Sequence, residues 1–311
     1  MKQDFPKIGI KLLCRLFGKT RHAYYDHQRR IQDQSLKDEI VLQHVLNIRK
    51  KQNRIGTLKL HFMLQEPLQQ HGMKIGRDYL FELMRTHGLH IRNRKRKAVT
   101  TNSRHWMHKY NNLIKELMIN RPEQVWVSDI TYIQLRKQWG YLSLVTDAYS
   151  KKIMGWALRK DLSAQGCVDA LKMAIADRKY PENKLIHHSD RGAQYCSKAY
   201  VDLLTDGNIA VSMTENGDPY ENAIAERVNG ILKAEFDLYG AQTGLRETTR
   251  KIRENIQTYN QIRPHASCDY LTPEQAHIKQ GELKKRWKPK KYKIEKNSTC
   301  IAQTEIANLG V

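Results

Sequence analysis

Three carboxylates, far apart along the chain, have the residue types needed for metal-dependent phosphoryl transfer. Asp129 lies inside a β-branched apolar run, Asp190 closes a second such run, and Glu226 follows after 35 intervening residues within a helical pattern. Hard divalent cations prefer oxygen ligands, and a pair of them about 4 Å apart can neutralise a phosphodiester and create an oxygen nucleophile. We therefore predict that Asp129, Asp190 and Glu226 are catalytic and bind two Mg²⁺ ions, for which Mn²⁺ can substitute.

The elements around these carboxylates predict how the three acids meet. Asp129 shares a strand face with Val127 and Thr131, where an unpaired charge is costly unless something positive binds it. Asp190 follows a neighbouring strand, and Glu226 lies near the start of a helix in a different layer. A strand, a strand end and a helix can therefore bring the three side chains together.

Alternating and apolar runs predict the order of elements in the middle of the chain. Strands are expected at residues 125–133, 141–146, 153–158, 184–189 and 210–213, and helices at 163–178, at 198–204 and from about 221 to 238. Three consecutive strands imply an antiparallel meander. The order β-β-β-α-β-α-β-α is that of an α/β, ribonuclease-H-like fold with a mixed five-stranded sheet covered by helices.

The distribution of charge predicts a nucleic-acid partner. The 311 residues carry a net charge of +22, with 25 Lys and Arg against 9 Asp and Glu in residues 1–119, 15 against 16 in residues 120–239, and 14 against 7 in residues 240–311. Basic flanks around a neutral centre favour double-stranded DNA held by the flanks and presented to the acids. The chain has no apolar run of about 18 residues and no signal-peptide pattern, so we expect a soluble, cytoplasmic protein with no membrane partner. Five separated cysteines favour neither a disulfide framework nor a zinc finger.

Residues 1–50 predict a first helix-turn-helix unit, part of an all-α N-terminal region. Apolar residues at helical spacing stop at Gly18, and Thr20 can cap a second helix that ends near Arg30. This second helix presents side chains suited to phosphates and to base edges in a major groove: Arg21, Tyr24, Tyr25, Gln28 and Arg29. The alternative is a small helical bundle whose polar face only meets water.

Residues 51–91 predict a second unit of the same kind, with Arg77 as a DNA contact. Five cations in six residues follow it directly: Arg92, Arg94, Lys95, Arg96 and Lys97. Such a run is often a solvated, flexible face. Here it begins a basic linker, residues 92–120, between a DNA-binding unit and a catalytic core, so we favour a segment that follows DNA phosphates.

Polar residues near the acids have separate expectations. Asn229 and Lys233 lie three and seven positions after Glu226 on the same helical face. Lys233 is a candidate for a phosphate contact, and the alternative is a solvated lysine. Arg191 either holds a phosphate or pairs with Asp190.

Other residues in this region are interpreted as structural. Asn222 buttresses the helix start, and His187 and His188 alternate across their strand as hydrogen-bonded histidines. Asp147 is a turn residue, and it is the substitute third acid if Asp129 fails.

The core is assigned to residues 121–239, followed by a C-terminal helical region at 240–282 and a basic segment and tail at 283–311. A helix is expected from Glu247 to about Ile262, and Thr272 with Pro273 opens a short one. The cations of the basic segment could clamp DNA, which makes the C-terminal part a basic, helical extension of the core.

Four motifs together resemble those of bacterial insertion-sequence transposases that share the retroviral integrase core. They are Asp129-Ile130-Thr131-Tyr132-Ile133, the run from His187 to Tyr195 around Ser189-Asp190-Arg191-Gly192, the run Glu221-Asn222-Ala223-Ile224-Ala225-Glu226, and Tyr259-Asn260 with Arg263-Pro264-His265. The resemblance covers about residues 10 to 280. More narrowly, the chain resembles the OrfB product of the two-frame OrfA/OrfB kind. The resemblance implies that Asp129, Asp190 and Glu226 are the metal ligands of a DDE site. The resemblance to retroviral integrases also implies that polar residues at the positions of Asn229 and Lys233 contact the DNA end.

The resemblance also implies a reaction and its partners. Hydrolysis at an end of the mobile element frees a 3′-hydroxyl, which attacks a second phosphodiester directly, without a covalent enzyme intermediate. Exchange of one phosphodiester for another needs no ATP, in agreement with the absence of a P-loop motif from the sequence. Two DNA ends must be held together, so a homodimer or a larger assembly on DNA is expected, together with an OrfA partner or fusion.

Three other functions are open to the sequence. A DNA-binding regulator with an inactive core would lack the carboxylates, and a ribonuclease-H-like nuclease would leave the basic helical units surplus. A tyrosine recombinase could use Tyr259, Arg263 and His265, but it would leave the acidic triad unexplained.

Overall fold

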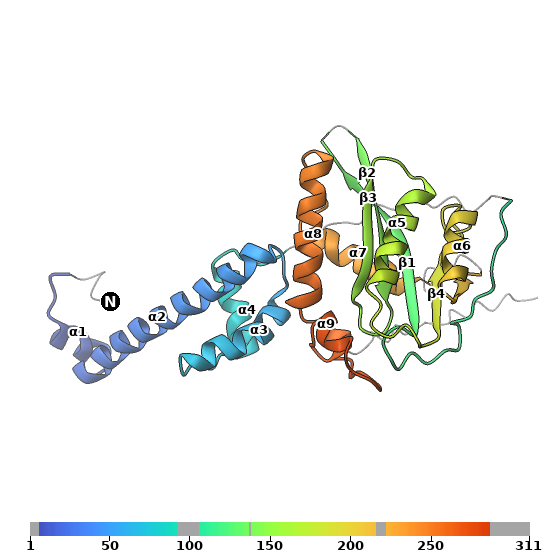
Figure 1. Cartoon of the computed structure of the whole chain (residues 1–311). Helices are drawn as coiled ribbons and strands as arrows, with labels where there is room; N and C mark the ends of the chain where they lie inside the picture. The colour runs from blue at the N-terminus through green and yellow to red at the C-terminus, as the bar shows by residue number, and fades with distance from the viewer. Residues whose placement is uncertain (1–5, 92–105, 137, 216–221, 287–311) are drawn as a thin grey trace, which may run out of the picture.

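The structure is a computed structural model of the chain, and it describes residues 6–91, 106–136, 138–215 and 222–286 (Figure 1). An α/β core lies beside a helical N-terminal region, and one long helix of that region projects away from the core (Figure 1).

Five strands form one mixed sheet in the order β3-β2-β1-β4-β5. They are β1 (Val125–Gln134), β2 (Trp139–Asp147), β3 (Ile153–Arg159), β4 (Leu185–Ser189) and β5 (Ile209–Met213). β2 pairs antiparallel with β1 and β3, whereas β4 pairs parallel with β1 and β5. The predicted strands, the antiparallel meander and the ribonuclease-H-like α/β fold are confirmed.

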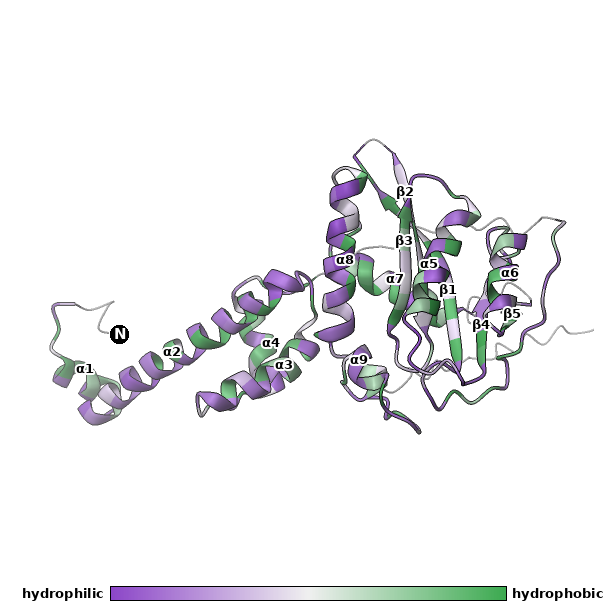
Figure 2. Ribbon diagram, in the orientation of Figure 1, coloured by the Kyte–Doolittle hydropathy of each residue, from purple (hydrophilic) through white to green (hydrophobic). Residues whose placement is uncertain are grey.

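Helices cover both faces of the sheet because successive side chains of each strand point to opposite faces. On one face, α5 (Ala164–Ala176) and α6 (Lys198–Asp206) pack in a buried cluster with Trp126. On the other, α7 (Ala223–Glu235) and α8 (Leu245–Gln261) pack in a cluster with Ile133. The hydrophobic colour of β1 and β4 in Figure 2 reflects this burial on two sides.

The N-terminal region contains α1 (Ile10–Leu16), α2 (Arg21–Lys51), α3 (Thr57–Gln70) and α4 (Arg77–Thr86). Thr20 caps α2 as predicted, since its hydroxyl accepts a hydrogen bond from the Ala23 N–H at 3.0 Å. The predicted end of this helix near Arg30 is wrong. No Gly or Pro interrupts residues 21–51, so the helix continues to Lys51.

The C-terminal half of α2 packs with the two helices that follow it. Val41 and Val45 are fully buried in one cluster with Leu60, Leu64 and Met84 of α3 and α4. The N-terminal half of α2 instead projects outward with α1 at its far end (Figure 1). The division into units 1–50 and 51–91 stays a prediction, and the packing joins half of α2 to the second unit.

The C-terminal helical region follows the core directly. After α8 come a short 3₁₀ helix, η1 (Ala266–Cys268), and α9 (Pro273–Ala276), which Thr272 and Gln275 cap reciprocally as expected for a Thr-Pro start. No helix among the described ranges is long and apolar enough to cross a membrane.

Three contacts of the described residues join the N-terminal region to the rest of the chain, one of them a hydrogen bond from the Arg54 N–H to the Glu235 carbonyl at 3.1 Å. The Lys59 ammonium lies 2.8 Å from the Glu235 carboxylate at the end of α7, and the rings of Phe62 and Tyr270 stack at 4.9 Å. These contacts hold the helical region against the core at α7, the helix that also carries Glu226.

Candidate active site

Asp129 lies within β1 and points to the face that α7 covers. Its carboxylate accepts hydrogen bonds from the Asn229 amide at 2.7 Å and from the Ile130 N–H at 2.9 Å. The Asn222 amide donates to the neighbouring Ser128 carbonyl at 3.0 Å, which ties the start of α7 to the same strand. The sequence showed Asn229 on the face of Glu226, but it gave no sign that its partner is 100 residues away.

Asp190 follows β4 and lies beside Asp129. The parallel pairing of Val127 with His188 is the last in the register, and each aspartate lies two residues further along its strand. The Gly192 N–H donates to Asp190 at 3.0 Å, in a turn where a Cβ on Gly192 would lie only 3.0 Å from that oxygen. The glycine therefore permits the turn that holds Asp190 in place.

Glu226 occupies the first turn of α7, with an exposed side chain. Burial, the negative charge of Asp190 and, to a lesser extent, that of Glu226 together raise the pKa of Asp129 to about 7. The hydrogen bonds from Asn229 and Ile130 act in the opposite direction and only partly offset this rise. Three carboxylates from β1, β4 and α7 thus share one electrostatic environment.

The donor set of this site fits a hard divalent cation. Asp129 forms no ion pair with any described Lys or Arg, and its pKa is raised first by burial and then by repulsion from Asp190, both of which a bound cation would offset. Among the residues that the structure describes, no three His, Cys, Asp or Glu side chains have the spacing of a formed metal site. The fit to a divalent cation therefore rests on the chemistry of the three carboxylates and not on their spacing in the structure.

Lys233 lies on the same helix, two turns after Glu226, and is half-buried. Burial lowers the pKa of its ammonium group, and the charge of Asp129 acts against that change. Lys233 therefore lies near Asp129, and its contact with a phosphate stays a prediction.

Comparisons with known proteins identify the family. Models of the Integrase core domain match residues 119–219 and 208–273. The insertion element IS600 uncharacterized 31 kDa protein of Shigella sonnei is 32% identical over 269 residues, which is 84% of this chain and 96% of that protein. Transposase InsF for insertion sequence IS3A of Escherichia coli (strain K12) is 31% identical over 279 residues, which is 86% of this chain and 94% of that protein. The chain belongs to the insertion-sequence transposases.

A solved structure also aligns with this transposase. The HTLV-2 integrase catalytic core domain in complex with magnesium, in its dimeric form, has a TM-score of 0.40 and 21% identity, over 50% of this chain and 97% of that chain. Family membership confirms the predicted transposase function and its class as a polynucleotidyl transferase. Neither the inactive regulator nor the ribonuclease-H-like nuclease gains support.

The predicted DNA contacts of the N-terminal region lie on the surface of the transposase where they are described. Arg21, Tyr25, Gln28 and Arg29 are exposed on the projecting part of α2, and Tyr24 is half-buried. Exposed Arg77 pairs with Asp78 at 2.8 Å. Arg92, Arg94, Lys95, Arg96 and Lys97 lie outside the described residues. Contact of any of these residues with DNA stays a prediction.

Three further residues near the acids are Arg191, His187 and His188. Arg191 is half-buried next to Asp190. Buried His187 contacts Ser128 at 2.7 Å and Tyr200 at 2.8 Å, and burial lowers its pKa to about 3. His188 contacts Ser212 at 2.8 Å. Both histidines are therefore structural, as predicted.

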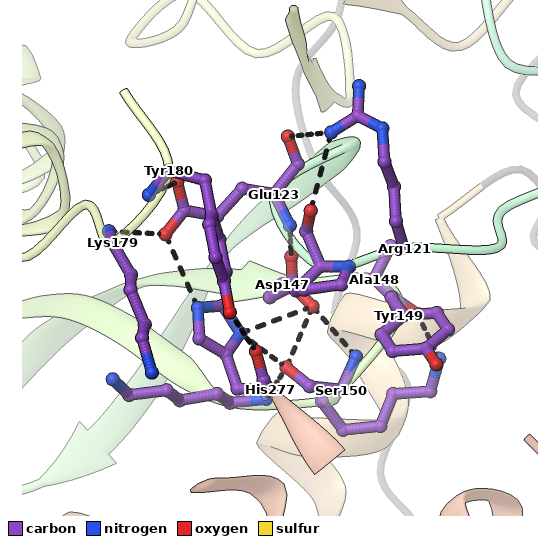
Figure 3. A network of polar contacts seen from close by, with 12 residues as sticks. Arg121, Glu123, Asp147, Ala148, Tyr149, Ser150, Lys179, Tyr180 and His277 are labelled. Atoms are coloured by element: carbon purple, nitrogen blue, oxygen red, sulfur yellow. Dashed lines mark hydrogen bonds and ion pairs between the residues drawn. The ribbon is translucent and has the colours of Figure 1, made fainter. Parts of the chain in front are cut away.

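A second polar cluster has the residue types of a nucleophilic triad, but its hydrogen bonds serve another purpose. Ser150, His277 and Asp147 meet with Glu123 at the end of the sheet where β1 begins and β2 ends (Figure 3). Asp147 accepts from the Ser150 hydroxyl, the Ser150 N–H and the Glu123 N–H, each at 2.7 Å. Since Ser150 donates its only hydroxyl proton to Asp147, it can only accept from His277 at 3.0 Å.

This donor count assigns a proton to both ring nitrogens of His277. The second nitrogen lies 3.3 Å from the Glu123 carboxylate, so both ring N–H groups donate and the imidazolium form is favoured. Burial by itself would lower the pKa of His277, but Asp147 and Glu123 raise it above its ordinary value. A protonated histidine cannot activate Ser150, and Ser150 is itself fully buried. Asp147 is therefore a turn residue, as predicted, with its oxygens already bonded.

The motif from Tyr259 to His265 is also structural in the transposase. Asn260 bonds both backbone polar groups of Ile153, at 3.0 and 2.9 Å, and fully buried Tyr259 donates to the Lys151 carbonyl at 2.9 Å. Arg263 donates two hydrogen bonds to Glu235, at 2.7 and 2.9 Å. A buried tyrosine with these bonds is not available as a recombinase nucleophile.

Proposed function

We propose that this transposase cleaves DNA at the ends of a mobile element and joins them to a new site by direct transesterification, with Asp129, Asp190 and Glu226 as its catalytic acids. The observation that carries the proposal is that the charges of Asp190 and Glu226 both act on Asp129, from three elements of a fold whose family performs this chemistry.

The residues have distinct roles in the proposed reaction. Asp129 and Asp190, fixed at neighbouring strands, and Glu226, on α7, would hold two Mg²⁺ ions, for which Mn²⁺ can substitute. Bound cations of this kind supply charge neutralisation and an activated oxygen. Asn229 orients the Asp129 carboxylate through its amide, and the Lys233 ammonium holds a phosphate of the DNA next to the acids.

The partners follow from the chemistry. Joining requires two element ends and a target duplex at one place, so the working form is a homodimer or a larger assembly on double-stranded DNA. We propose an OrfA product, either separate or fused to this chain, as a further partner. With DNA as its substrate, the enzyme acts in the cytoplasm of the bacterial cell.

The test is a joining assay with purified protein, Mg²⁺ or Mn²⁺, and labelled DNA that carries the ends of the encoding element. The wild-type protein is expected to produce cleaved and joined products, and Asp190→Asn and Glu226→Gln are each expected to reduce joining by at least about 10³-fold. Removal of one ligand of a paired-metal site costs several kcal/mol of transition-state stabilisation, which corresponds to such a factor.

Glu182→Gln is the matched control, because this exposed carboxylate lies at the opposite end of β4 from Asp190. It is expected to join DNA at the wild-type rate. Equal joining by wild type and both active-site variants would leave these acids without a catalytic role.

A further inference from the structure

An open groove of about 1170 Å³ lies between the first turns of α8 and the residue that follows β3. Four cations line it, namely Arg246, Arg250 and Arg253 of α8 and Lys160. Among the described residues of its lining Glu247 is the one acid, so this part of the groove is strongly positive. It is separate from the carboxylate site and from every residue assigned above to DNA.

The three arginines form a row on the exposed side of α8. They are spaced four and three residues apart, which places them on one helical face, beside the face that buries Ile252 and Ile256. All three arginines and Lys160 are exposed, and none forms an ion pair within the described ranges. Like charges at this spacing destabilise a helix, so the row is explained by an anionic ligand rather than by the fold.

The geometry of the row favours an extended polyanion. Seven residues of helix separate Arg246 from Arg253, a length of about 10 Å at 1.5 Å per residue. One strand of duplex DNA presents a phosphate about every 3.4 Å along its axis, so the row spans about three phosphates. Arginine binds phosphate oxygens with paired N–H donors, so each side chain of the row can hold one phosphate.

The groove is within reach of DNA at the carboxylates. Tyr132 of β1 pairs with Tyr141 of β2, which pairs with Arg159 at the end of β3. Lys160 is therefore about four residues along and two strands across from Asp129, or about 16 Å away at the usual strand spacings. This distance is about five base pairs of duplex.

We propose that this arginine row binds the backbone of the target duplex into which the element is joined. The inference rests on the proposed function. The lining described above has no Asn, Gln or aromatic side chain to recognise base edges, and phosphate contacts carry no sequence information. Such a surface suits a target of any sequence, whereas recognition of the element ends requires base contacts of the kind predicted for α2.

The experiment compares Arg246→Gln/Arg250→Gln/Arg253→Gln with Lys172→Gln/Lys184→Gln/Lys279→Gln. Both variants lose three exposed charges, and the lysines lie away from the groove, on α5, before β4 and after α9. The arginine variant is expected to retain hydrolysis at the element end within about twofold, and to join a pre-cleaved end to plasmid DNA at least about tenfold more slowly at 150 mM salt. The lysine variant is expected to match wild type in both reactions.

A binding measurement decides the proposal even if no joining is found in the wild-type protein. The affinity for a fluorescent duplex of random sequence is measured between 50 and 200 mM salt. Loss of three phosphate contacts is expected to reduce the slope of log K against log salt by about 2 to 3 in the arginine variant only. Circular dichroism melting checks that each variant is folded, and Arg250→Gln alone, on the exposed face, should show a smaller change of the same kind.

Two results would overturn the inference. If the arginine variant keeps the wild-type joining rate and salt slope, the row does not bind the target. If end hydrolysis and joining fall equally, the row binds the element end instead. If the wild-type protein neither hydrolyses nor joins DNA, but the expected difference in salt slope between the two variants is still found, the result would count against the proposed function. The row would then remain a DNA-binding surface.

Discussion

Two carboxylates, one packed against α7 and one at its C-terminal end, have opposite environments. Asp129 faces the helix from β1, where burial and the charges of Asp190 and Glu226 raise its pKa to about 7. Glu235 is the last residue of α7, and although burial by itself would raise its pKa, Arg263 and Lys59 lower it to about 2. One carboxylate is surrounded by other acids and the other by bases.

The difference separates a functional charge from a structural one. Arg263, with 1% of its side chain exposed, donates two hydrogen bonds to Glu235, and the two charges satisfy each other. Lys59 is the lesser partner, because burial and the Arg263 charge lower the pKa of its ammonium. Asp129 receives only the neutral Asn229 amide and a backbone N–H. The fold thus neutralises the acid that stabilises it and leaves uncompensated the acid that we propose to bind a cation.

The largest effect is expected at Asp129. Asp129→Asn keeps the shape of the side chain but removes one of the three negative charges, so joining should fall by at least about 10³-fold. The same change relieves repulsion, so the thermal midpoint of the metal-free protein should stay equal or rise. The joining assay and calorimetry of the same preparation test both parts. A variant that joins normally, or that loses activity only by unfolding, would contradict the comparison.

At Glu235 the expected pattern is reversed, with a large loss of stability. Glu235→Gln leaves the buried Arg263 guanidinium without a counter-charge, and breaking such a pair costs about 3 to 5 kcal/mol in the free energy of unfolding. Denaturation in urea measures the loss. The matched control is Asp177→Asn, whose ion pair with Lys152 lies at the surface with 57% of the aspartate exposed, and it should cost less than about 1 kcal/mol. Equal losses in the two variants would show that burial of the Glu235 pair has no special weight.

Much of the fold was predictable from the sequence, because the signals for each helix or strand lie within that element. β-branched runs such as the one around Asp129, the Thr272-Pro273 start of α9 and the helical spacing from Leu58 to Leu64 each report their own conformation. The end of α2 was missed because polar residues near Arg30 resemble a helix end. Burial of Val41 and Val45 against α3 and α4, which is a long-range effect, supports the additional turns.

The candidate site was likewise predictable only in part. Residue types and spacing predicted three acids from three elements. The structure brings two of them side by side, and the charge of the third acts on Asp129. The contact of Asn229 with Asp129 and that of Arg263 with Glu235 were not predictable, because each joins residues that are distant in sequence and follows from how α7 crosses the sheet. Arg263 belonged to a recognised motif, but the motif alone did not show what it binds.

The smallest effect expected from this comparison is in the pH dependence of stability. The pKa of Glu235 is about 2 in the folded protein and about 4.5 ordinarily, so its stabilising contribution is complete above pH 4.5 and is lost as the pH falls toward 2. The full contribution is about 3 kcal/mol, of which about 1.4 kcal/mol should be gone at pH 3.5. Urea denaturation at pH 6, 5, 4 and 3.5 should therefore show a stability gap between wild type and Glu235→Gln that is constant at first and then narrows. Groups present in both proteins, Asp129 among them, cancel in that difference, so a gap that stays constant down to pH 3.5 would mean that Glu235 is not held ionised by Arg263.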